Sequence, residues 1–106
     1  MAKPARIKPK ANATPTAQEK QFHLWLMDAF DCVCGCGQQA TVVHHPLTRH
    51  PLQRWRRDHE YVVPMDAHCH FALHANGNER KFLPGHDLAG SAWGYRAKGI
   101  DAGYLS

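Results

Sequence analysis

The central third of the chain is dense in side chains that bind metals. Seven of the nine histidines and one of the four cysteines lie between His44 and His74. The other three cysteines stand at alternate positions from 32 to 36. Thiolates and imidazoles are the preferred protein ligands of zinc, and imidazole also binds other divalent ions. The residue types and their spacing therefore predict metal binding, with either a structural or a catalytic role for the ion.

Disulfide bonds are the competing use of the cysteines. The chain begins without the apolar core of a secretory signal, so we expect a cytoplasmic protein. In a reducing compartment, cysteines interleaved with histidines more often bind metal than form disulfides. Cys32, Cys34 and Cys36 are also too close in the chain to pair with one another without strain. We favour a metal site over disulfides, with buried free thiols as a further alternative.

Length and composition predict a single small domain. The chain has 106 residues, and no stretch approaches the roughly 20 apolar residues of a membrane span, so no membrane association is expected. A domain of this size often needs a metal or disulfides to hold it together. The formal charge of +4 belongs to the first 20 residues, which carry five basic and one acidic residue.

A disordered basic arm is predicted for residues 1–15, which contain three prolines and no acidic residue. Its basic residues are Lys3, Arg6, Lys8 and Lys10. Composition allows two roles for this arm: a solubilising tail, or an arm that follows the phosphates of DNA.

The first helix should begin at Thr16, because Thr16-Ala-Gln-Glu19 has the sequence of a capping box. Apolar residues then recur at helical spacing and form one stripe for packing. They are Phe22, Trp25, Leu26 and Ala29. His23 lies just off this stripe, and we interpret it as a surface or packing residue.

A cysteine-containing turn and two short strands are expected next. Gly35 and Gly37 allow residues 31–37 to form a tight turn that would suit thiolates converging on one ion, as in a zinc knuckle. Residues 41–45 and residues 61–64 are short β-branched runs and predict two strands.

A second helix is expected over residues 66–75, directly after the second strand, and Gly77 should end it. His70 and His74 are one turn apart on this helix and so share one face. The expected order of strand, strand and helix thus places histidines at the end of the first strand and on the helix that follows the second strand.

Two segments are predicted to be irregular. Residues 47–60 carry arginines around a tryptophan, which fits phosphate contacts and base stacking or, alternatively, a solvated charged loop. The residues concerned are Arg49, Arg54, Trp55, Arg56 and Arg57. Residues 84–106 are punctuated by glycines, and we expect a loosely ordered end with Trp93 and Tyr95 packed back on the domain.

Several spaced motifs together resemble one superfamily of nucleases. They are Val-Val-His44-His45, the run Val-Val-Pro-Met-Asp66-Ala-His-Cys69-His70-x-x-Leu-His74, and Gly77-Asn-Glu79-Arg-Lys-Phe. With the entry to the first helix and the knuckle, they resemble the HNH endonuclease superfamily, and within it the phage recombination-enhancement (Ref-like) nucleases, over roughly residues 14–83.

The fold that this resemblance implies is α+β. Its centre is a small ββα-metal core (HNH, or His-Me finger) with an N-terminal helix, a zinc knuckle and the disordered basic arm. The expected divisions are residues 1–15 for the arm, 16–83 for the HNH-type domain and 84–106 for a Gly-rich C-terminal extension.

The family pattern implies a structural zinc between the knuckle and the start of the second helix. The ligands that we favour are Cys32, Cys36, Asp66 and Cys69, an allowed tetrahedral set. Cys34 is an alternative to either knuckle cysteine, and His68 is an alternative to Asp66. The chain departs from the family here, because relatives carry cysteine at position 66, histidine at position 69 and a Cys-x-x-Cys knuckle.

The pattern also implies a catalytic Mg²⁺, Mn²⁺ or Zn²⁺ ion. Its ligands would be His44, His70 and His74. His45 would be the general base that activates water for attack on a phosphodiester. The alternative for His44 and His45 is a structural zinc site without catalysis. The family's asparagine is missing ahead of position 64, and Asp58 or His59 is our candidate for the residue that orients the base or the metal.

The function that these expectations favour is a bacterial or phage-encoded, metal-dependent DNA endonuclease or nickase. DNA is the expected partner, and the resemblance to Ref-like proteins implies a recombinase filament and a role in recombination. A zinc-binding DNA adaptor that keeps the fold and has lost the chemistry is the alternative. The altered zinc residues and the missing asparagine favour that alternative.

Overall fold

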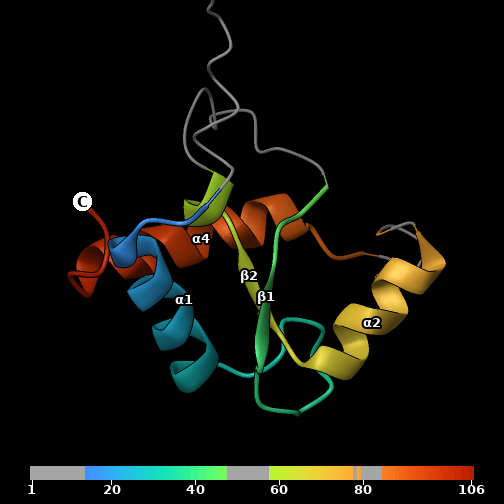
Figure 1. Ribbon diagram of the computed structural model, residues 1–106. Helices are drawn as coiled ribbons and strands as arrows, with labels where there is room; N and C mark the ends of the chain where they lie inside the picture. Colours follow the sequence, from blue (N-terminus) through green and yellow to red (C-terminus); the bar gives the residue numbers. More distant parts are fainter. Residues whose placement is uncertain (1–13, 48–57, 78, 80–84) are drawn as a thin grey trace, which may run out of the picture.

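The structure is a computed structural model that describes residues 14–47, 58–77, 79 and 85–106. Its elements are α1 (Ala17–Ala29), β1 (Val42–His44), the 3₁₀ turn η2 (Asp58–Glu60), β2 (Val63–Met65), α2 (Ala67–Asn76) and α4 (Leu88–Asp101). In Figure 1, α1 and α2 flank the two strands and α4 passes behind them. Within the described ranges, three α-helices thus surround a two-stranded antiparallel sheet, which confirms the α+β class. No helix among them is long and apolar enough to span a membrane.

Helix α1 begins as the capping box predicts. The Thr16 hydroxyl accepts a hydrogen bond from the Glu19 N–H at 3.1 Å, and the Thr16 N–H donates to Glu19 Oε1 at 2.8 Å. Phe22 and Leu26 of the predicted stripe are fully buried. They pack with Leu105 from the other end of the chain, so α1 is a wall of the core.

The two strands form close to their predicted positions and pair antiparallel, with His44 of β1 opposite Val63 of β2. The prediction of residues 61–64 for the second strand begins two residues too early and ends one residue too early, because β2 is Val63–Met65. Pro64 is tolerated there because both strands of a two-stranded sheet are edge strands. Its carbonyl accepts a hydrogen bond from the Val33 N–H at 2.9 Å.

Helix α2 follows β2 after a single residue, Asp66, which is its N-cap. Gly77 ends the helix, as predicted, in the left-handed conformation with a φ of 74°. The short connection fixes the start of α2 against the end of the sheet. It therefore also fixes where His70 and His74 lie relative to β1.

The expectation of a loosely ordered C-terminal end is wrong. Residues 88–101 form α4, which Asp87 caps by accepting the Gly90 N–H at 3.0 Å. Glycine weakens a helix, but here apolar contacts outweigh that weakness. Trp93 stacks on Tyr61 with ring centroids 5.8 Å apart, which confirms its predicted return to the domain.

Tyr95 also returns to the domain as predicted, and its ring contacts Phe30 with centroids 5.1 Å apart. Leu88, Ala92 and Leu105 belong to the same buried clusters as residues from α1, β2 and α2. The C-terminal segment therefore shares its core with the residues before position 84.

Candidate metal centres

Four cysteines from two separate segments converge at the start of α2. Cys32, Cys34 and Cys36 come from the knuckle turn, and Cys69 comes from the first turn of the helix. Their sulfur atoms all lie within 4.8 Å of one another. Cys32 is buried and Cys36 is exposed, so the cluster runs from the core to the surface.

The knuckle turn takes its shape from two glycines and from its attachment to β2. Gly35 and Gly37 have φ values of 85° and 88°, a region that side chains with a Cβ rarely adopt. Between the first two cysteines, the Val33 N–H is tied to the Pro64 carbonyl. The turn therefore holds its thiols beside the residues that lead into α2.

The sulfur–sulfur distances fit a tetrahedral zinc site. They are 3.3 Å between Cys32 and Cys34, 3.5 Å between Cys34 and Cys69, and 3.8 Å between Cys36 and Cys69. Four Zn–S bonds of about 2.3 Å in tetrahedral geometry place the sulfurs about 3.8 Å apart. All four cysteines are free rather than paired in disulfides. The cluster could therefore bind a metal such as zinc.

Protonation opposes metal binding at this cluster. Burial raises the pKa of Cys32 to about 11 and also raises the pKa of Cys69 above its usual range. Burial opposes ionisation of Cys34 too, but hydrogen bonds from the neighbouring thiols outweigh it and lower the pKa of Cys34. A divalent cation must displace the remaining protons, because thiolates are the metal ligands.

Asp66, which the sequence favoured as a zinc ligand, lies beside the cluster and caps α2. Its Oδ1 accepts the N–H groups of His68 at 2.9 Å and Cys69 at 3.1 Å, and its Oδ2 accepts the Cys36 thiol at 3.3 Å. Hydrogen bonds from the side chain and the N–H of Cys69 hold the pKa of Asp66 well below its usual range. Cys34 belongs to the close group of possible ligands and Asp66 does not. The exposed His68, the other alternative, is also outside this group.

Three histidines form a second group, between β1 and α2. They are His44, His70 and His74, and their ligand nitrogens lie within 4.8 Å of one another. The Nε2 atoms of His70 and His74 are 3.0 Å apart, and the ring centroid of His44 lies 5.2 Å from that of His70. His44 is buried and His74 is exposed, so the group opens to solvent along α2.

The protonation of His70 favours metal binding by this histidine group. Burial lowers the pKa of His70, and the charges of His44 and His74 lower it further. A lowered pKa keeps more of the ring neutral near neutral pH, and the neutral ring is the form that binds a metal. Three neutral imidazoles suit Zn²⁺ better than Mg²⁺ or Mn²⁺, which prefer oxygen ligands.

Glu79 also contacts the histidine group, and the site residues predicted from the sequence did not include it. Its Oε2 accepts hydrogen bonds from His44 Nε2 at 2.5 Å and from the Leu47 N–H at 2.9 Å. Glu79 belongs to the third motif of the HNH resemblance, which is the one sequence signal that marks it. No local spacing rule connects it to a residue 35 positions earlier.

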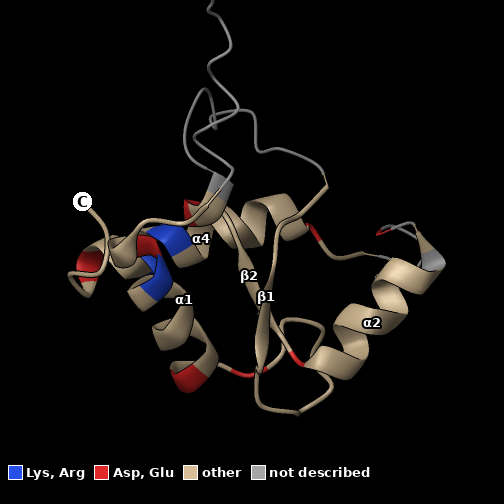
Figure 2. Ribbon diagram, in the orientation of Figure 1, with Lys and Arg blue, Asp and Glu red and all other residues tan. Residues whose placement is uncertain are grey.

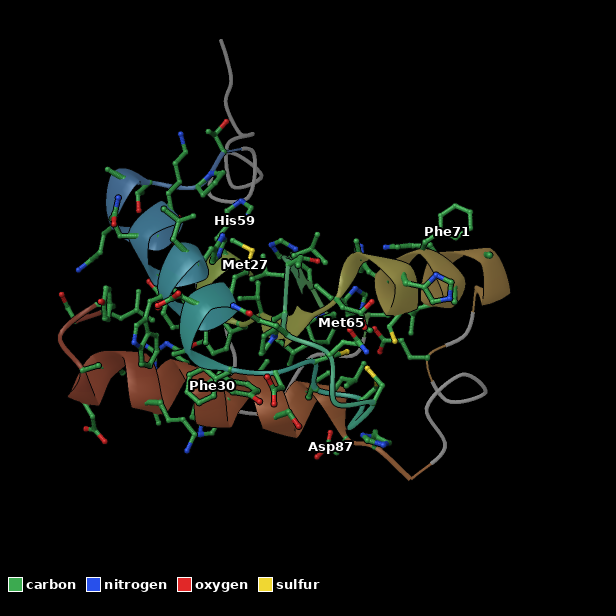
Figure 3. The ribbon with its side chains drawn as sticks, turned by 90° about the horizontal axis from the view of Figure 1, so that it is seen from below. Met27, Phe30, His59, Met65, Phe71 and Asp87 are labelled. Carbon is green, nitrogen blue, oxygen red and sulfur yellow. The ribbon has the colours of Figure 1, made fainter. Side chains whose placement is uncertain are left out.

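His45 is the residue directly after β1, and it contacts η2 and α1. Its Nε2 is 2.9 Å from Nδ1 of His59 in η2. His23 of α1 reaches the same turn, where its Nε2 is 2.7 Å from the His59 carbonyl oxygen. Figure 3 shows His59 beside α1 and well separated from Phe71 on α2.

The predicted orienting residue His59 is thus in contact with the predicted base. The side chain of Asp58, the other candidate, lies outside the described part. His23 is a packing residue, which was one of its two expected roles, because its ring contacts those of Phe22, His45 and His59. The structure adds a hydrogen bond to η2. Burial lowers the pKa of His23, which favours its neutral form. Nothing in the sequence signals a contact between residues 36 positions apart.

The residues predicted to contact DNA lie outside the described residues. They are Lys3, Arg6, Lys8, Lys10, Arg49, Arg54, Trp55, Arg56 and Arg57. Figure 2 shows the lysines and arginines of the described part on α1 and α4, and none on α2 beside the histidine group.

Comparison of the chain with protein-family models, curated proteins and solved structures finds no match. The likeness to HNH nucleases therefore depends on the sequence motifs alone.

Proposed function

We propose that the protein is a metal-dependent endonuclease of HNH type that hydrolyses DNA phosphodiesters. The supporting observation is the histidine group, in which one residue of β1 and two residues of α2 bring their ring nitrogens close enough to bind one ion. It consists of His44, His70 and His74. Catalytic metal sites typically use three protein ligands and keep a position for water or substrate, whereas sites with four thiolates are structural. This chain has one group of each kind, with three histidines in one and four cysteines in the other.

The structural role falls to the four-cysteine cluster. A zinc ion there would join the knuckle turn to the first turn of α2, and α2 carries two of the three histidines. The cluster would thus hold the histidine group in place without taking part in the chemistry.

His45 is the proposed general base. The metal, when bound, would stabilise the charge that develops on the phosphoryl oxygens. If His45 Nε2–H donates to Nδ1 of His59, Nδ1 is the nitrogen of His45 that carries the lone pair, and it would take a proton from the attacking water. His59 then also stabilises the imidazolium that forms. His44 and His45 are consecutive but face different elements, so the proposal requires a phosphate bound at the end of β1 to meet both the ion and the base.

A second candidate is the zinc-binding DNA adaptor without catalysis. The observation that favours it is the position of His45, which contacts η2 and α1 while its neighbour faces α2. In this case both metal groups stabilise the fold, and DNA is bound without being cut.

Cleavage of supercoiled plasmid and of single-stranded DNA separates the two candidates. The protein is incubated with each DNA and with Mg²⁺, Mn²⁺ or Zn²⁺, beside His45→Ala and His44→Ala. His86→Ala is the matched control, because His86 is exposed and belongs to neither histidine contact set. We expect cleavage by the wild type and the control, and a loss of about 100-fold or more in His45→Ala, the usual contribution of a general base. Absence of cleavage by the wild type with every ion, or equal cleavage by His45→Ala, would overturn the proposal.

A further inference from the structure

Glu79 makes two hydrogen bonds through one oxygen at the edge of the histidine group. Its Oε2 accepts from the His44 ring at 2.5 Å and from the Leu47 N–H at 2.9 Å. Both side chains are shielded, with 2% of His44 and 12% of Glu79 exposed. Charge-assisted hydrogen bonds to a carboxylate are stronger when the carboxylate is largely removed from water.

The choice of ring nitrogen follows from this contact. An ionised carboxylate only accepts hydrogen bonds, so Nε2 of His44 must carry the proton. The lone pair of His44 is then on Nδ1, and Nδ1 is the atom left to bind an ion. Glu79 does not belong to the group of possible ligands whose binding atoms lie within 4.8 Å of one another. It therefore lies behind a ligand rather than among the ligands.

We propose that Glu79 is a positioning residue for the metal ligand His44. Metal-binding histidines commonly donate their second N–H to a carboxylate, which fixes the ring and makes the ligating nitrogen more basic. The inference rests on the proposed role of the histidine group as a metal site. It adds a residue to that site and states which nitrogen of His44 binds the ion.

The second hydrogen bond extends this role to the backbone. Leu47 follows the two histidines and Pro46, so its N–H lies where the chain leaves β1. By holding the His44 ring and the Leu47 N–H together, Glu79 fixes the exit of the strand relative to the end of α2. Loss of the carboxylate should therefore affect the orientation of the His44 ring more than it affects the stability of the fold.

Cobalt binding tests the proposal without relying on DNA cleavage. The cysteine cluster of the full chain is first filled with one equivalent of Zn²⁺, and Co²⁺ is then titrated while its visible absorption is followed. Glu79→Ala should weaken Co²⁺ binding by about 10- to 100-fold, the usual effect of removing such a partner. Glu79→Gln should weaken it less, because the amide oxygen can still accept both hydrogen bonds. Glu60→Gln is the matched control, since Glu60 pairs with Arg96 of α4 at 2.9 Å.

The outcomes separate this proposal from the nuclease proposal. If His44→Ala loses Co²⁺ binding and Glu79→Ala keeps it unchanged, Glu79 does not position the ligand and the inference is overturned. It is also overturned if the wild type, with its cysteines filled, binds no Co²⁺. The inference is supported if Glu79→Ala retains the first Zn²⁺ and if the affinity for Co²⁺ falls from the wild type to Glu79→Gln and falls further in Glu79→Ala. That pattern would stand even if no DNA were cut, a result that would reject only the nuclease.

Discussion

Replacement of Gly99 by alanine should destabilise the protein, whereas the same replacement at Gly94 in the same helix should stabilise it. A Cβ added at Gly99 would lie 2.5 Å from Cε1 and 2.8 Å from Cδ1 of Phe22, and 3.4 Å from Cδ1 of Leu105. A Cβ at Gly94 would meet nothing within 4 Å. Both variants therefore lose the backbone flexibility of glycine to the same extent, and they differ only in the contacts that the added Cβ makes.

The magnitude follows from two opposing effects. Alanine in a helix interior is favoured over glycine by about 1 kcal/mol, which both variants gain. Gly99→Ala must also push aside the ring of Phe22, which is fully buried. Overpacking of this kind costs about 1–3 kcal/mol. The difference between the two variants should therefore be about 1–3 kcal/mol, with Gly99→Ala the less stable.

Thermal unfolding by circular dichroism measures this difference. Both variants and the wild type are compared in the same excess of Zn²⁺, because a bound metal adds to the apparent stability. For a domain of about this size, 1 kcal/mol corresponds to roughly 4–8 °C in Tm. If Gly99→Ala raises the Tm as much as Gly94→Ala does, then α4 does not pack against Phe22 as described.

Four further outcomes are expected. Cys34→Ala should lose tight zinc binding in a chelator competition, whereas Asp66→Asn, which can still cap α2, should keep it; the reverse order would favour the mixed ligand set. Zinc affinity should rise from about pH 6 to about pH 8, because burial raises the pKa of Cys32 and the metal must displace protons; an affinity independent of pH would contradict this. Burial lowers the pKa of His23, so the unfolded chain binds the proton first as the pH drops below about 6.5, and the free energy of unfolding should fall there. Urea titrations at several pH values should show a shallower fall for His23→Gln than for the wild type. An equal fall in both proteins would exclude His23 as the cause. Deletion of residues 1–15 should weaken DNA binding and flatten its dependence on salt without unfolding the domain, as measured by fluorescence anisotropy at several salt concentrations; an unchanged slope would exclude phosphate contacts by this arm.

Features with neighbours close in the chain could be predicted from the sequence. The helix start at Thr16, the helix end at Gly77 and the pairing of His70 with His74 depend on residues within about one helical turn. The density of cysteines and histidines likewise predicted metal ligands, and the structure gathers four cysteines into one cluster. Ligand types are a property of composition, so tertiary structure was not needed to recognise them.

Features that join distant segments could not be predicted in the same way. The glycines after position 84 predicted an irregular end, but α4 forms because its apolar residues find partners on α1 and β2. The sequence also offered more zinc ligands than one ion requires. The orientation of the first turn of α2 decided that Asp66 caps the helix while Cys34 faces the other sulfurs.

The sequence by itself therefore determined which chemistry is available to this protein: thiolates and imidazoles for metals, and helices and turns to carry them. The tertiary structure alone decided which groups meet, including Glu79 with His44 and His23 with His59. The physical reason is that caps and turns depend on a few adjacent residues. Contacts across 35 or 36 positions exist only once the packing of the core has placed the elements.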